Sequence, residues 1–174
     1  MSPEQFARLT ALLDCAGPSG FERAPARLWR EQAAFADDGA SDVSGNSYAT
    51  IHPSPGSASP ARVMLAGHID EIGVIVVHID DDGFCWFEPI GGWDSQVFVG
   101  QRVTLLGRRG PVPGVIGKPA IHLMDQAARE KHTKHHELWI DIGAASRAEA
   151  EGLIGVGTAG VLGSTVTRLP NDRL

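Results

Sequence analysis

The chain has 174 residues, of which 15 are basic and 21 acidic, giving a net charge of −6. This length suits one domain, or one domain and part of another, and the acidic balance argues against nucleic acids and anionic membranes as partners. No apolar run approaches the ~18 residues of a membrane span, the N-terminus lacks a signal-peptide core, and two cysteines make no disulfide framework. We therefore expect a cytoplasmic protein.

The first forty residues predict two amphipathic helices. Ser2 is placed to cap the first helix, and Gln5 can complete a capping box with it. Apolar side chains recur at helical spacing from Phe6 onward, which predicts that one face of this helix packs against another element. After a Gly-Pro-Ser-Gly stop, Ser19 and Glu22 predict a second capping box and a second helix.

Short strands are predicted from Gly39 onward. Residues 42–43 and 48–51, on either side of a Gly-Asn pair, indicate a strand, a turn and a strand. The apolar run 63–66 is typical of a buried strand, and it leads directly into a polar cluster. Two helices followed by such a strand are what we expect at the start of an α/β domain.

A dense series of strands follows, over about seventy residues. We predict a small barrel or sandwich here, inserted into the α/β domain. A polar segment at 118–136 reads as a long loop, and Ser146 with Glu149 predicts the cap of a short helix. The predicted strands are 74–79, 84–87, 97–106, 112–116 and 137–142.

His68 and Asp70 are the first candidates for chemistry. They follow the predicted buried strand, and side chains two residues apart on a strand share a face. Histidine is the commonest metal ligand, and a ligating histidine usually donates its other ring N–H to a carboxylate. Asp70 is placed for that supporting role, or for binding the metal itself. The tripeptide alone also fits a structural histidine–aspartate pair.

The other candidate sites have weaker support. His132, His135 and His136 have a spacing that can hold a metal, but their neighbours are charged and polar, which favours a solvated loop. The Gly-Gly-Trp-Asp stretch at 91–94 fits a turn held by one buried tryptophan better than a binding corner.

Six short sequence segments occur in a particular order along the chain. The ordered series is far more specific for one protein family than any single segment. They are Gly-Pro-Ser-Gly-Phe-Glu at 17–22, Ala-Gly-His-Ile-Asp-Glu-Ile-Gly at 66–73, Pro-Ile-Gly-Gly-Trp-Asp at 89–94, Gly-Gln-Arg-Val at 100–103, Gly-Val-Ile-Gly-Lys-Pro at 114–119 followed by His122, and Glu-Leu-Trp-Ile-Asp-Ile-Gly-Ala at 137–144. With this series the chain resembles the M42 family of metallo-aminopeptidases, the group of glutamyl and tetrahedral aminopeptidases.

The resemblance implies an α/β fold: an α/β/α metallopeptidase domain interrupted by an inserted PDZ-like small β-barrel domain. It would place the N-terminal part of the catalytic domain at 1–72, the inserted assembly domain at 73–164, and a return toward the catalytic domain at 165–174. It implies removal of N-terminal residues from peptide substrates by two divalent metal ions, zinc or cobalt. It also implies homodimers that assemble into a dodecamer.

Carried over by position, His68 matches the first metal ligand and Asp70 the carboxylate that orients it. The family's other ligands and its glutamate base match no residue of this chain, so the resemblance implies an N-terminal portion. Alone, we expect this portion to hold at most one metal weakly and to be inactive, since a catalytic zinc needs about three protein ligands. The alternatives are a non-catalytic oligomerisation or peptide-binding module and, third, a carbohydrate hydrolase.

Overall fold

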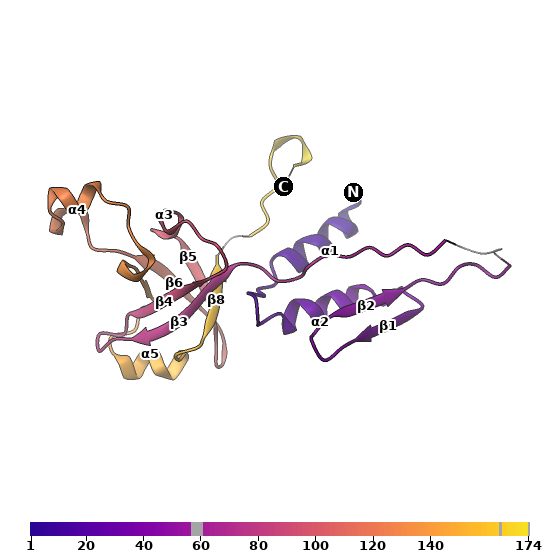
Figure 1. Ribbon diagram of the computed structural model, residues 1–174, viewed down its shortest axis with the longest axis horizontal. Coiled ribbons are helices and arrows are strands. Elements are labelled where there is room, and N and C mark those ends of the chain that lie inside the picture. The colour runs from indigo at the N-terminus through magenta and orange to yellow at the C-terminus, as the bar shows by residue number, and fades with distance from the viewer. Residues whose placement is uncertain (57–60, 164, 174) are drawn as a thin grey trace. The chain divides into compact units, whose positions relative to one another are not determined.

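The computed structural model describes residues 1–56, 61–163 and 165–173 and divides the chain into two compact units. The first unit comprises Met1–Asp70 with Thr165–Leu174, and the second comprises Glu71–Ser164. The fold class is α/β, with helices and a hairpin in the first unit and a closed barrel in the second (Figure 1). The assignment of the units to a catalytic and an inserted domain stays a prediction.

Helix α1, Pro3–Leu13, begins with the capping box that the sequence predicts. The Ser2 hydroxyl accepts from the backbone N–H of Gln5 at 3.2 Å, and the Gln5 side chain accepts from the Ser2 N–H at 2.8 Å. On the predicted face, Phe6 and Leu12 are half-buried. Helix α1 contacts the second helix, α2, Arg23–Gln32, which also contacts the hairpin (Figure 1).

The second predicted capping box is wrong. Helix α2 has Glu22, not Ser19, at its N-cap, and no side chain caps it. The Glu22 carboxylate instead accepts from the backbone N–H of Gly20 at 2.6 Å. Because α2 begins several residues after Ser19, the Ser19 hydroxyl cannot reach the free backbone N–H groups of the first turn. It bonds to a residue distant in the sequence instead.

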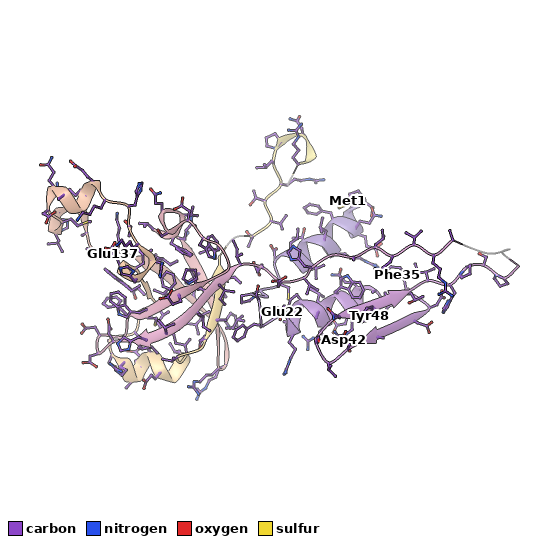
Figure 2. All side chains as sticks on the ribbon, in the orientation of Figure 1. Met1, Glu22, Phe35, Asp42, Tyr48 and Glu137 are labelled. Carbon is purple, nitrogen blue, oxygen red and sulfur yellow. The ribbon has the colours of Figure 1, made fainter. Side chains whose placement is uncertain are left out.

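The predicted hairpin is present, with its first strand earlier in the chain than expected. Strand β1, Asp38–Ser41, pairs antiparallel with β2, Ser47–Thr50. The Asp42 carboxylate lies in the turn and accepts from the backbone of Ser44, the backbone and side chain of Asn46, and the Tyr48 hydroxyl (Figure 2). Because its carboxylate bonds to these groups, Asp42 belongs to the turn and not to the strand. Strand β1 therefore ends at Ser41, before the predicted residues 42–43.

The buried strand predicted at 63–66 is wrong. Residues 61–70 are described by the structure and none of them is in a strand. Val63, Met64 and Leu65 are 81, 86 and 94% exposed. An apolar run becomes a strand only when a neighbouring strand accepts its backbone hydrogen bonds, and none of the described residues does so here.

The second unit is a closed six-stranded antiparallel barrel, which confirms the predicted small barrel. Its strands neighbour one another in the order β3-β4-β7-β6-β5-β8. The last strand was not predicted, because its glycine-rich segment lacks the usual strand residues. The strands are β3 Gly73–Ile79, β4 Cys85–Ile90, β5 Arg102–Gly107, β6 Gly110–Gly117, β7 Trp139–Asp141 and β8 Ala159–Leu162.

The apolar core of the described residues lies inside this barrel. Phe98, at the end of the short helix α3, Ser95–Phe98, packs edge-on against Phe87 with ring centroids 5.3 Å apart. Trp93 packs on Phe98 and donates its indole N–H to the Gly73 carbonyl at 3.0 Å, as expected of a turn held by a tryptophan. The buried core residues are Val74, Val76, Ile79, Cys85, Phe87, Phe98, Val103, Leu105, Ile116, Leu138, Ile140, Ala150 and Ile154.

Short helices complete the second unit. The helix α5, Arg147–Leu153, begins at Ser146, whose hydroxyl accepts from the Glu149 N–H as predicted. The segment predicted as a loop, 118–136, contains three single-turn pieces: η1 Ile121–Leu123, α4 Gln126–Glu130 and the start of η2 His135–Glu137. Among the described residues, no helix has the length and apolarity needed to cross a membrane.

Candidate functional site

The structure brings His68, Asp70 and Ser19 together within the first unit. The Nδ1 atom of His68 lies 3.0 Å from Oδ1 of Asp70 and 3.0 Å from the Asp70 backbone oxygen. The hydroxyl of Ser19 donates to the other carboxylate oxygen, Oδ2, at 2.5 Å. A continuous chain of hydrogen bonds therefore runs from Ser19 through Asp70 to His68.

The partners of Nδ1 determine the protonation of the His68 ring. Both atoms within hydrogen-bond distance of Nδ1 are oxygens that can only accept, so Nδ1 carries the proton. In the neutral ring, Nε2 then holds a lone pair, and the His68 side chain is 86% exposed. This is the tautomer and the accessibility that a histidine needs to bind a metal through Nε2.

Asp70 is held as a carboxylate by the same contacts. The hydrogen bond from Ser19, followed by that from His68, lowers the pKa of Asp70 below its ordinary value. In its charged form Asp70 strengthens the N–H donation from His68. Oδ1 of Asp70 faces Nδ1 of His68 and Oδ2 accepts from Ser19, an arrangement that fits the orienting role predicted for Asp70.

These three residues offer one candidate ligand and not a complete metal centre. Among the residues that the structure describes, no group of three or more histidine, cysteine, aspartate or glutamate side chains could hold a metal. A catalytic zinc takes about three protein ligands and keeps one open position. His68 therefore fits as a single oriented ligand, and a bound metal needs donors in addition to the described set.

The histidines near the end of the 118–136 segment have structural contacts. His135 lies 2.9 Å from Glu88 through Nε2, and its ring meets that of His136 edge-on at a centroid distance of 5.5 Å. The contact with Glu88 holds η2 against strand β4. These contacts agree with the interpretation of the three histidines as part of a polar loop.

Sequence reasoning missed the role of Ser19. It was interpreted as a helix cap, whereas its hydroxyl bonds a carboxylate 51 residues further along the chain. The same short polar residue types serve as caps and as long-range donors, so local spacing cannot separate the two uses. One feature of the sequence could have linked the two residues. Ser19 lies in the segment 17–22 and Asp70 in the segment 66–73, and both segments carry the resemblance to the family.

Comparison with known proteins identifies relatives over most of the chain. Residues 45–174 match the family model described as M42 glutamyl aminopeptidase. The lysyl aminopeptidase of Pyrococcus furiosus is 35% identical over 117 residues, which cover 66% of this chain and 34% of that protein.

Solved structures show the same fold. The TET aminopeptidase of the marine sediment archaeon Thaumarchaeota archaeon SCGC AB-539-E09 has a TM-score of 0.89 and 33% identity, over 98% of this chain and 47% of that one. The TET1 peptidase of Pyrococcus horikoshii, which can assemble into a tetrahedron or a large octahedral shell, has a TM-score of 0.78 and 28% identity, over 95% and 48%. The chain thus spans about half the length of these solved relatives.

Proposed function

We propose that this chain, which belongs to the M42 family of glutamyl aminopeptidases, forms the N-terminal part of a metal-dependent enzyme that removes N-terminal residues from peptides. The observation that carries the proposal is the hydrogen-bonded series Ser19–Asp70–His68, which leaves Nε2 of His68 exposed and, in the neutral ring, able to accept a metal. In the proposal His68 binds one of two divalent metals, zinc or cobalt. The aminopeptidase names of the relatives support the reaction class.

Each of the three residues has a separate task in this proposal. Ser19 holds the carboxylate of Asp70, and Asp70 holds the His68 ring in the tautomer whose Nε2 can bind a metal. When bound, the metal pair would supply polarisation of the scissile carbonyl and activation of a water molecule. The substrate-binding residues and the proton-transferring base are not assigned to any described residue.

The 174 residues alone should not hydrolyse peptides. The described residues supply one histidine ligand where about three are needed, so a metal would be held weakly. We therefore expect activity only from a protein in which further ligands join His68, whether on a longer chain or on a second one. An intact mass of the native protein, compared with 18.5 kDa for this chain, distinguishes these forms.

We also propose that the barrel is the PDZ-like domain through which the protein self-associates, with dimers assembling into a dodecamer. The assembly of the structurally similar TET1 peptidase into closed shells supports this. The barrel also encloses its own apolar core, so it can serve as an assembly module with or without catalysis. Sedimentation analysis of the native protein should show a species much larger than one chain, whereas a monomer at micromolar concentration would contradict the proposal.

The substitution His68→Ala, made in an active protein that contains these residues, tests the assigned ligand. We expect it to abolish peptide hydrolysis and to lower the bound metal, because the ligand is lost while the fold is retained. His52→Ala is the matched control, since His52 is an exposed histidine of the same unit that also pairs with an aspartate, Asp38, at 2.5 Å. Equal activity and metal content in the two variants would exclude His68 as a ligand.

A further inference from the structure

The surface of the barrel unit carries a hollow that the proposed activity does not use. Its volume is 280 Å³, slightly below the ~300 Å³ at which pockets for small molecules begin. It is lined by residues in and just after α3 and by residues of the segment that contains α4. The α4 segment projects from the rest of the barrel unit (Figure 1). Its lining residues are Gln96, Val99, Lys118, Arg129, Lys131, His132 and Thr133.

The charge of this hollow is opposite to that of the whole chain. Lys118, Arg129 and Lys131 line it together with His132, and its lining includes no aspartate or glutamate. The chain as a whole has a net charge of −6. Because like charges repel, three cations around one small volume favour the binding of a compact anion there.

Within the described part of the chain, the cations of the hollow have no direct ion-pair partner. None of the ion pairs found there includes Lys118, Arg129 or Lys131. The Lys118 ammonium has a long contact of 3.5 Å with the Thr133 hydroxyl, and Arg129 donates its Nε–H to the Met124 carbonyl at 3.0 Å. The Arg129 side chain is thereby positioned through Nε, which leaves its two terminal nitrogens to bind a ligand.

The walls of the hollow are attached to the barrel. The Ser95 hydroxyl, in α3, donates to the Thr133 carbonyl at 2.6 Å, which ties the two sides of the hollow together. His135, two residues after Thr133, pairs with Glu88 of strand β4. These contacts hold Thr133 and its neighbours in place, so the cost of ordering the site on binding is reduced.

We propose that this hollow is a binding site for a multivalent oxyanion, recognised by Lys118, Arg129 and Lys131. Phosphate and carboxylate groups share the required chemistry: acceptor oxygens that guanidinium and ammonium groups bind by charge-assisted hydrogen bonds. The Gln96 amide and the Thr133 hydroxyl can add neutral donors. The site lies entirely in the barrel unit, and the inference does not depend on the proposed peptidase activity.

A titration of the ¹⁵N-labelled 174-residue chain at low ionic strength tests the site, with sodium phosphate, sodium sulfate and sodium succinate as probes. We expect saturable amide shifts confined to residues around Lys118 and 129–133, which weaken as sodium chloride screens the charges. Removing two charge-assisted contacts in Arg129→Gln/Lys131→Gln should weaken binding by about tenfold or more. Phosphate binding tighter than succinate would identify a phosphate group as the ligand, and the reverse order a carboxylate.

The matched control is Arg108→Gln/Arg109→Gln, which removes the same charge from the exposed turn between β5 and β6. It should leave the affinity nearly unchanged. Equal weakening in the two double variants, or shifts that never saturate, would overturn the proposal in favour of diffuse attraction. If Arg129→Gln/Lys131→Gln no longer gives the amide spectrum of a folded barrel, the single variant Lys131→Gln replaces it. The Lys131 side chain is exposed, so this substitution should leave the fold intact.

Discussion

Asp70 is the residue whose charge the proposed site needs most. Its carboxylate accepts from both Ser19 and His68, and these hydrogen bonds hold its pKa below the ordinary value. Asp70→Asn preserves the shape but removes the charge, and an amide can present its N–H to His68. In an active protein that contains these residues, we expect a loss of about 10–100-fold in metal affinity or activity.

Metal content and peptide hydrolysis measure this effect. Asp38→Asn is the control, because Asp38 is another aspartate of the first unit that pairs with a histidine, His52. It should leave both quantities near those of the unmodified protein. If the two substitutions lower metal affinity equally, Asp70 has no special role in orienting His68.

The two cysteines differ in reactivity because one lies in the barrel core. Burial, followed by the charges of Asp80 and Asp141, raises the pKa of the Cys85 thiol to about 11. The folded protein therefore keeps Cys85 protonated at pH 8, whereas Cys15 is only half-buried. We expect a thiol reagent at pH 8 to label Cys15 first and Cys85 only after unfolding.

The same raised pKa predicts a dependence of stability on pH. The unfolded thiol begins to ionise near its ordinary value of 9.0, before the folded thiol does, so alkaline pH favours the unfolded chain. This part of the stability is present at neutral pH and is lost between pH 9.0 and about 11. A Cys85→Ala variant should lack it, and equal alkaline destabilisation of variant and parent would contradict the assignment.

At the scale of elements, the barrel could be predicted because its strands carry their own signals. Five strands are recognisable as β-branched or aromatic runs between turns. Strand β8 gives no such signal, since its position depends on the backbone of β5 and β3 coming close to Gly160. Strand β8 is present but was not predicted, whereas the run 63–66 was predicted as a strand and is not one. Its apolar residues suit a strand, but no described neighbour pairs with them.

The candidate site could be predicted only where its residues are close in sequence. His68 and Asp70 are two residues apart, so their spacing alone indicated a contact. Ser19 is separated from them by about fifty residues, and its capping pattern with Glu22 gave a local explanation that the fold does not use. The metal-binding role itself rests on the exposed Nε2 of His68 together with family membership, and it stays a proposal.

Two glycines of the barrel unit should respond to alanine in opposite directions. A Cβ on Gly160, in β8, would lie 2.7 Å from the Thr104 carbonyl oxygen and from a Leu105 methyl group. Overpacking of this kind costs about 1–3 kcal/mol. Gly152 lies in α5 with open space around its Cβ position, so alanine there should stabilise by roughly 0.5–1 kcal/mol.

Urea unfolding of the two variants measures both changes. Gly152→Ala serves as the control for the substitution itself, since both variants add a single methyl group. The predicted result is a lower unfolding midpoint for Gly160→Ala and a higher one for Gly152→Ala. Equal midpoints would mean that β8 does not pack against β5 as closely as described.

At the scale of the whole molecule, the two units should differ in stability. Of the buried apolar side chains among the described residues, Pro18, Pro25 and Ala26 belong to the first unit and all the others to the barrel unit. In the first unit Phe35 is 72% exposed, and Val63 to Leu65 are more exposed still. With few buried and many exposed apolar side chains, the first unit should have low stability and a tendency to associate, unless further protein covers these side chains.

Hydrogen exchange of the 174-residue chain measures this difference directly. Amides of β3 and β5 should remain protected long after those of α1 and of the β1–β2 hairpin have exchanged, because opening the barrel requires loss of its core. Equal protection of residues 6–35 and 74–79 would show that the first unit is as stable as the barrel.

The central claim is that these residues belong to a metal-dependent aminopeptidase, and its most direct test is hydrolysis by the purified native protein. The substrates are one peptide with a free N-terminus and the same peptide with an acetylated N-terminus. We predict stepwise release of N-terminal residues from the free peptide only, loss of this activity with a chelator, and recovery with zinc or cobalt. Cleavage of the acetylated peptide, or full activity in the chelator, would contradict the account.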